Sequence, residues 1–227
     1  STLNRLMVVE FALPAALPGL LVGLHYGVQL SRPHWGFTSD TGGKRTRWII
    51  GGMGLLALGG IGAALGVTLF AQSYQLALLL SLLAYALIGV GVGASGTSLL
   101  ALLATATAPH QRAAAAMITW LMMIFGIALT AGLAGSFLDP YSASRLMMVV
   151  SVICVAAFVV TILAMGRIER GLRLKAEPAS MSFIDGMRDV WRETRTRHFT
   201  IFVFLSMNAY FMQELILEPY AGLIFGF

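Results

Sequence analysis

The sequence predicts an all-α protein built as a polytopic bundle of transmembrane helices. Of its 227 residues, 58% are hydrophobic and only 11% are charged, a composition that a soluble domain of this length cannot hide in one core. The apolar residues form uncharged runs as long as the roughly 20 residues that a helix needs to cross about 30 Å of hydrocarbon. The basic residues gather in a few segments between these runs. Lipid is therefore expected to cover much of the surface.

The apolar runs predict six spans, the first of them partial, followed by a seventh. Residues 3–13 are too short to cross, so we expect them to be the end of a longer helix. Full spans are expected near residues 15–31, 48–70, 75–104, 113–138 and 146–166, and again from about 198 to 217. The helix ends are marked by prolines, whose missing N–H is tolerated there: Pro14, Pro109, Pro140 and Pro219.

Three regions follow from this pattern: a transmembrane bundle (1–166), a basic linker (167–197) and the first span of a second bundle (198–227). Because the first residue is not Met and the first apolar segment looks incomplete, we expect these residues to belong to a longer protein.

The basic residues predict which side of the membrane each loop faces. Of the 15 Lys and Arg residues, 13 fall in the segments 32–47, around Arg112 and 167–197, which alternate topology places on one side. This is the positive-inside pattern, so those segments are expected in the cytoplasm. This distribution accounts for the pI of about 9.8, so the basic character of the chain does not require a nucleic-acid partner, and we expect none. Cys154 is the only cysteine, which excludes a disulfide framework.

The linker is predicted to contain an amphipathic helix. Ser182 and Asp185 form a capping box, and Phe183, Met187 and Trp191 then recur at helical spacing. The polar residues of the segment include Arg188, Arg192 and Arg195, which suit anionic lipid headgroups. Such a helix is either a surface linker between two bundles or a docking site for a partner.

Glycines are concentrated in the spans rather than in the loops. The sequence holds 25 glycines, among them Gly59, Gly62 and Gly66 in one span and Gly89, Gly91, Gly93 and Gly96 in the next. Small residues let helices approach closely in lipid. The same strips could instead leave room for a flat ligand.

The segment between the second and third spans carries a motif that runs Gly-Phe-Thr-Ser-Asp-Thr-Gly-Gly-Lys-Arg. Its glycines, Gly36 and Gly43, suit a tight turn, while Asp40 can pair with Lys44 and Arg45 to hold helix ends together. The spacing resembles the loop signature of the major facilitator superfamily at the same place. That resemblance implies a major-facilitator-like N-terminal half plus the first span of a second half.

A closer resemblance, inside that superfamily, is to the PucC/LhaA-type proteins of phototrophic bacteria. It lies in residues 3–10, 36–40, 199–206 and 215–219. The short turn at residues 40–43 makes the chain similar to the branch labelled a bacteriochlorophyll synthase subunit, since antenna-assembly members tend to carry an insertion there. The resemblance implies an inner (intracytoplasmic) membrane location and a role in bacteriochlorophyll supply and light-harvesting assembly. Implied partners are antenna polypeptides or bacteriochlorophyll-synthesis enzymes such as a geranylgeranyl reductase.

Ionisable residues inside spans are costly and are therefore candidates for function. They are Arg5, Glu10, His25, Glu214 and Glu218. A neutral imidazole can be an axial ligand of magnesium, so His25 is the candidate ligand of bacteriochlorophyll or a precursor, with Glu10 as a second cofactor-binding candidate. The alternatives are hydrogen bonds between helices or, for the carboxylates, proton coupling in a transporter.

The sequence lacks a phosphate loop, a dinucleotide fingerprint, a paired-His metal motif and a nucleophile elbow. We therefore predict a non-enzymatic membrane protein of bacterial photosynthesis that scaffolds a pigment-synthesis enzyme or handles pigment, with catalysis in a partner. The alternative is a major facilitator superfamily transporter of a small solute, which the fold also supports.

Overall fold

The computed structural model describes residues 2–9, 11–14, 16–41, 45–138, 141–168 and 182–225, and within these ranges it contains helices and no strand. The chain divides into two compact units, residues 1–178 and 179–227, which are described separately. The predicted all-α class is confirmed.

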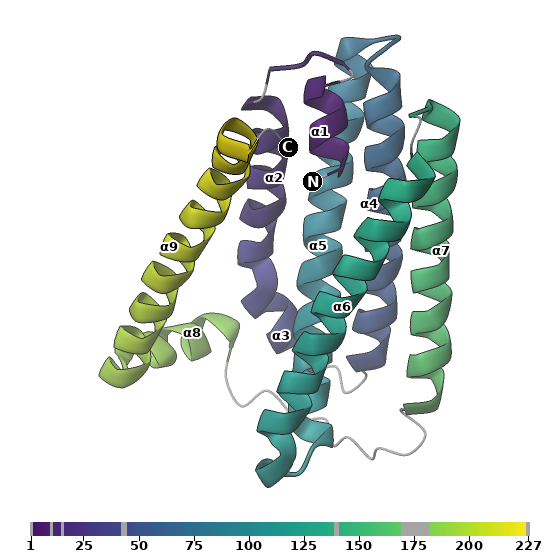
Figure 1. Ribbon diagram of the computed structural model, residues 1–227. Coiled ribbons are helices and arrows are strands. Elements are labelled where there is room, and N and C mark those ends of the chain that lie inside the picture. Colours follow the sequence, from purple (N-terminus) through teal and green to yellow (C-terminus); the bar gives the residue numbers. More distant parts are fainter. Residues whose placement is uncertain are drawn as a thin grey trace. The chain divides into compact units, whose positions relative to one another are not determined.

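The first unit holds seven α-helices among its described residues, connected in part by short 3₁₀ turns (Figure 1). They are α1 (Thr2–Val9), α2 (Ala16–Val28), η1 (Gln29–Ser31), α3 (Arg32–Thr41), α4 (Arg45–Leu69), α5 (Tyr74–Ala106), η2 (Pro109–Gln111), α6 (Arg112–Leu138) and α7 (Ala143–Ile168). The second unit holds α8 (Phe183–Arg192) and α9 (Thr194–Phe225).

Four of these helices are long and apolar enough to cross a membrane: Arg45–Leu69, Tyr74–Ala106, Pro109–Leu138 and Ala143–Gly166. They coincide with the four strongest apolar runs of the sequence. The spans predicted at residues 15–31 and 198–217 fall on α2 with η1 and on α9, and their crossing of the membrane stays a prediction.

Glycines bring α4 and α5 into backbone contact along their length. A Cβ atom at Gly91 would lie 2.6 Å from the Leu56 amide nitrogen and 2.7 Å from the Gly52 carbonyl oxygen. One at Gly59 would lie 2.9 Å from the carbonyl oxygen of Ala84. Backbone atoms thus fill the space that a side chain would need, which establishes close packing, rather than room for a flat ligand, at these positions.

The other faces of this pair pack against α2 and α7. A Cβ atom at Gly89 would lie 2.7 Å from the His25 carbonyl oxygen, so α2 approaches α5 as closely as α4 does. On the far side of α4, Gly60 faces the sulfur of Cys154 in α7. The main core joins all of these helices with α1: Leu6, Met7, Leu21, Ala63, Ala64, Val67, Ala84, Tyr85 and Leu146.

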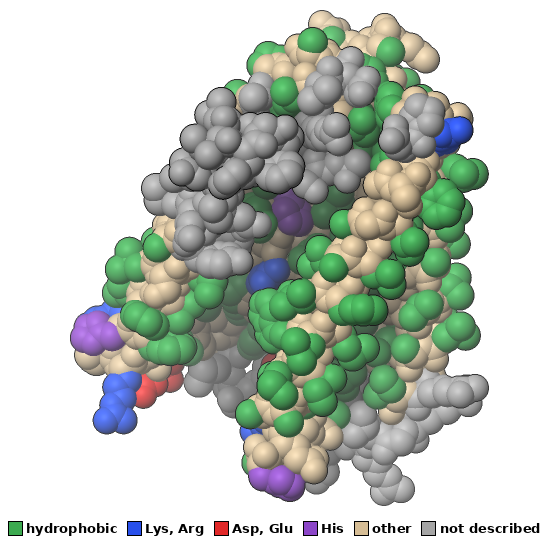
Figure 2. Space-filling view, in the orientation of Figure 1, with side chains coloured by type: hydrophobic (Ala, Val, Ile, Leu, Met, Phe, Trp, Pro, Cys, Tyr) green, Lys and Arg blue, Asp and Glu red, His purple; other side chains and the backbone are tan. Residues whose placement is uncertain are grey.

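Helix α6 differs from its neighbours because it has no buried residue. It meets the rest of the unit mainly through α7 and α5. Hydrophobic side chains cover its visible surface in Figure 2. Trp120 and Phe125 of this helix are 60% and 69% exposed. In a membrane this surface is suited to lipid.

Two sequence expectations about helix ends were wrong. The segment from Arg32 was expected to be a loop, but helix continues to Thr41 as α3, so Gly36 and Asp40 are helical. Pro33 lies in the first turn of α3, where no intrahelical N–H is needed. Pro219 was expected at a helix end but lies within α9. Prolines are tolerated inside transmembrane helices where neighbouring groups satisfy the freed carbonyls.

Candidate functional site

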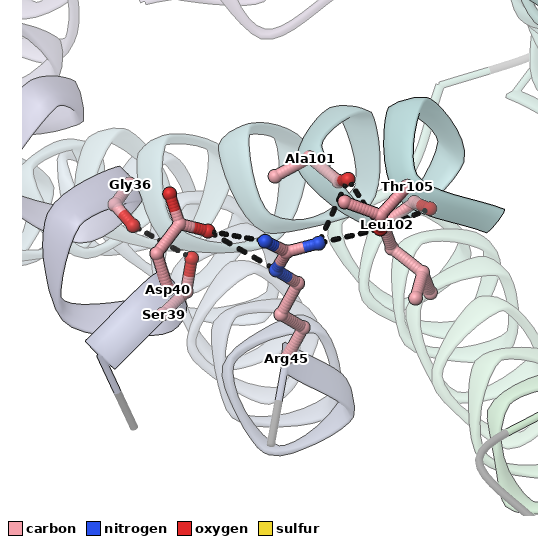
Figure 3. A network of polar contacts seen from close by, with 7 residues as sticks. All are labelled: Gly36, Ser39, Asp40, Arg45, Ala101, Leu102 and Thr105. Atoms are coloured by element: carbon pink, nitrogen blue, oxygen red, sulfur yellow. Dashed lines mark hydrogen bonds and ion pairs between the residues drawn. The ribbon is translucent and has the colours of Figure 1, made fainter. Parts of the chain in front are cut away.

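A polar network joins the end of α3, the start of α4 and the last turns of α5 (Figure 3). The Arg45 guanidinium, at the start of α4, donates from Nη2 and Nε to Asp40 Oδ1 at 2.7 and 3.1 Å. Its Nη1 donates to the Ala101 carbonyl oxygen at 3.0 Å and to Thr105 Oγ1 at 2.5 Å. Thr105 in turn donates to the Ala101 carbonyl at 2.9 Å.

The arrangement of this network indicates a structural role. The Arg45 guanidinium contacts the last two turns of α5, near the helix end where carbonyl groups make the dipole negative. Its side chain is 15% exposed while that of Asp40 is 51% exposed, so solvent weakens the ion pair more than the contacts to α5. Next to it, Ser39 donates to the Gly36 carbonyl at 2.9 Å, and Gly36 packs on Thr97 of α5.

The predicted pairing within the loop motif is thus confirmed for Asp40 and Arg45. Gly43 and Lys44 lie outside the described residues. The sequence did not reveal Thr105 and Ala101 as partners, because they lie 60 and 56 residues away from Arg45.

A second polar group lies on α2, η1 and the start of α3. Gln29 Nε2 lies 2.7 Å from His25 Nε2, and Arg32 Nη2 donates to Gln29 Oε1. The His25 ring also contacts Tyr26 edge-on, with centroids 5.0 Å apart. His25 Nδ1 is buried and has no hydrogen-bond partner within the described ranges. Gln29 and Arg32 were missed from the sequence, although they follow His25 at helical spacing.

Aromatic residues extend this region toward the Arg45 network. Trp35 Nε1 donates to Ser31 Oγ at 2.9 Å, and the ring of Trp35 lies 5.5 Å from that of Trp48 on α4. Gly93 of α5 lies beside Trp35, and a Cβ atom there would be in ordinary van der Waals contact with the ring at 3.5 Å. The indole groups therefore fix the junction of α3, α4 and α5.

The predicted amphipathic helix is α8. Ser182 Oγ accepts from the Asp185 amide at 3.3 Å and donates to its carboxylate at 2.6 Å, which confirms the capping interaction. Met187 and Trp191 are 49% and 54% exposed, and Phe183 is half-buried. Arg188 lies 4.0 Å from Asp185, while Arg192 and Arg195 are exposed.

The other predicted site residues lie wholly, or with their side chains, outside what the structure describes. Glu10 lies outside the described residues. Arg5 is on α1, and Glu214 and Glu218 are on α9, but their side chains are not described. In the part of the chain that the structure describes, no three His, Cys, Asp or Glu residues are grouped as metal ligands.

Comparison with known proteins identifies the family. A sequence model of the family described as PUCC protein matches residues 2–227. The chain belongs to the PUCC protein family. This confirms the resemblance read from the motifs.

The relatives are longer than this chain. A Rhodobacter capsulatus protein named bacteriochlorophyll synthase 44.5 kDa chain is 62% identical over 100% of this chain and 53% of its own length. Protein PucC of Cereibacter sphaeroides is 32% identical over 97% of this chain and 51% of its own length. The chain thus spans about half the length of these relatives. No solved structure matches it, so its place in the major facilitator superfamily stays a prediction.

Proposed function

We propose that this chain is a non-enzymatic part of the membrane machinery that supports bacteriochlorophyll synthesis or delivery and light-harvesting assembly. The observation that carries the proposal is the 62% identity, along the whole chain, with a relative named as a chain of bacteriochlorophyll synthase. More distant relatives carry the name protein PucC. Those proteins are about twice as long as this chain. An activity that needs their full length is therefore assigned to this chain only as part of the proposal.

The contacts within the site favour a scaffold over a catalyst. Arg45 is committed to Asp40 and to α5, and Gln29 is committed to His25 and Arg32. Arg45 thereby holds the ends of three helices together, and Gln29 holds neighbouring side chains of one helical stretch in place. Catalysis is therefore assigned to a partner, such as a pigment-synthesis enzyme.

The partner surface proposed is the apolar face of α8, formed by Phe183, Met187 and Trp191 and bordered by Arg188 and Arg192. In the proposed topology this helix lies on the cytoplasmic side of the inner membrane with the other basic segments. An amphipathic helix of this kind suits a groove on a membrane-associated enzyme or antenna polypeptide.

Pigment handling is the second part of the proposal, with His25 as the candidate contact. A neutral imidazole binds magnesium through the lone pair of an unprotonated ring nitrogen. The unpartnered Nδ1 fits a role toward a ligand, but Nε2 already faces the Gln29 amide. Ligation therefore requires Gln29 to move away first.

Deletion of the gene in its phototrophic host tests the function. We expect less finished bacteriochlorophyll or fewer assembled antenna complexes, with unchanged uptake of soluble nutrients. Normal pigments and antenna, together with loss of proton-coupled solute flux in reconstituted vesicles, would replace this proposal with a transporter.

A narrower experiment tests the α8 surface together with Arg195 at the start of α9. Reversing Arg188, Arg192 and Arg195 to Glu should weaken co-purification of the partner several-fold, because charges at an interface rim each contribute up to about 1 kcal/mol. The matched control reverses three exposed arginines of the first unit, Arg47, Arg112 and Arg145, so that the net charge changes by the same amount. Equal loss in both variants would assign the effect to net charge rather than to α8.

A further inference from the structure

Arg32, Gln29 and His25 form a hydrogen-bond chain with a fixed direction. A guanidinium only donates, so the Gln29 atom that Arg32 meets must be the carbonyl oxygen Oε1. The same amide then turns its nitrogen toward His25 Nε2, 2.7 Å away. An amide nitrogen also only donates, so His25 Nε2 must accept.

This direction determines where the imidazole proton lies. A ring nitrogen accepts a hydrogen bond only when it carries no proton, and in a neutral imidazole the proton is then on the other nitrogen. We infer that Arg32 and Gln29 hold His25 as the neutral tautomer protonated at Nδ1, and that they occupy the Nε2 lone pair through which His25 would bind a metal. Gln29 and Arg32 are thus positioning residues for His25.

The inference also indicates what His25 offers to a ligand. The buried Nδ1 has no acceptor within the described ranges, and an unmade buried hydrogen bond is unfavourable. A protonated Nδ1 suits an acceptor oxygen, such as a keto or ester carbonyl on an apolar molecule. A ligand that approached Nδ1 through such a carbonyl would leave Gln29 in place, whereas a metal tetrapyrrole bound at Nε2 must displace it.

The tautomer can be measured directly, without any pigment. In protein labelled with ¹⁵N-histidine, wild type should show an unprotonated Nε2 and a protonated Nδ1 for His25, assigned by its loss in His25→Asn. The isosteric variant Gln29→Glu should reverse this, because a carboxylate accepts from both Arg32 and a protonated Nε2. Gln72→Leu, at a turn in the same unit, is the control and should leave the spectrum unchanged. A protonated Nε2 in wild type would overturn the inference.

A second measurement concerns the metal and rests on the proposed function. Titration with bacteriochlorophyll should give about fivefold tighter binding in Gln29→Leu than in wild type, since roughly one hydrogen bond no longer competes for Nε2. The His25→Ala substitution should remove this gain. If the wild-type tautomer is as inferred but no variant binds the pigment, the pigment proposal fails and the inferred tautomer stands. Equal affinities of wild type and Gln29→Leu for the pigment would show that the Gln29 amide does not compete with magnesium for His25 Nε2.

Discussion

Helices α5 and α6 are similarly apolar, yet they pack in opposite ways. In α5, 39% of the most apolar stretch is buried, against 0% in α6. The contact faces of α5 consist of small residues, such as Ser81, Gly89 and Gly91. The surface of α6 carries large side chains, such as Trp120 and Phe125, that reach outward.

The difference shows that hydrophobicity alone does not decide which helices associate. Lipid tails are as apolar as Leu, so an apolar helix gains little by leaving lipid for a neighbour of the same character. Close backbone approach adds dispersion contacts and needs Gly, Ala or Ser at the interface. Helix α5 uses its small residues in this way on two faces, toward α4 and toward α2, whereas an added Cβ atom at Gly126, Gly132 or Gly135 of α6 would have no neighbour within 4 Å.

Among the glycine substitutions, the largest expected effect is at the α4–α5 interface. Gly91→Ala places a Cβ atom 2.6 Å from the Leu56 amide nitrogen and forces the backbones apart, so unfolding free energy should fall by about 1–3 kcal/mol. In α6, Gly132 has no atom within 4 Å of such a Cβ, and Gly132→Ala should raise stability by up to about 1 kcal/mol through helix propensity. Thermal unfolding in detergent should show shifts of opposite sign. Equal shifts would remove the distinction between the two helices.

The next effect concerns the polar network that supplements the glycine contacts. Arg45→Ala should destabilise by about 2 kcal/mol, because the contacts to Ala101 and Thr105 are lost and Asp40 loses its cation. Asp40→Ala should cost only about 0.5–1 kcal/mol, because its carboxylate is half exposed. Melting curves of both variants test the order. A larger loss for Asp40→Ala would mean that the ion pair, rather than the contact to α5, holds these helix ends.

The smallest effect is expected on the lipid-facing surface of α6. Leu121 is 58% exposed, so Leu121→Ala should change stability by less than about 0.5 kcal/mol. Leu146 on α7 is fully buried, and Leu146→Ala should cost about 2–5 kcal/mol. If Leu121→Ala is as costly as Leu146→Ala, α6 is covered by protein in the assembled state, and cross-linking from position 121 would identify that cover.

The sequence predicted the helical class and the long apolar helices, because uncharged runs of that length have few other solutions in a membrane. It also predicted the glycine strips and the pairing of Asp40 with Arg45. It did not predict that Gly89 faces α2 while Gly91 faces α4, since composition does not tell which side of a helix meets which neighbour. It also missed the hydrogen bond between Gln29 and His25. Helical spacing places the two side chains near each other, but the direction of their hydrogen bond depends on Arg32, which fixes the orientation of the Gln29 amide.

The Arg45 network has a consequence for the order of membrane insertion. Asp40 is five residues before Arg45, whereas the Ala101 carbonyl is 56 residues after it. During synthesis at about 5–20 residues per second, Arg45 emerges roughly 3–11 s before its partner on α5. In that interval the guanidinium has only its local carboxylate as a partner. The contacts to Ala101 and Thr105 can form only when α5 has been inserted, so they mark completion of the α4–α5 hairpin during biogenesis.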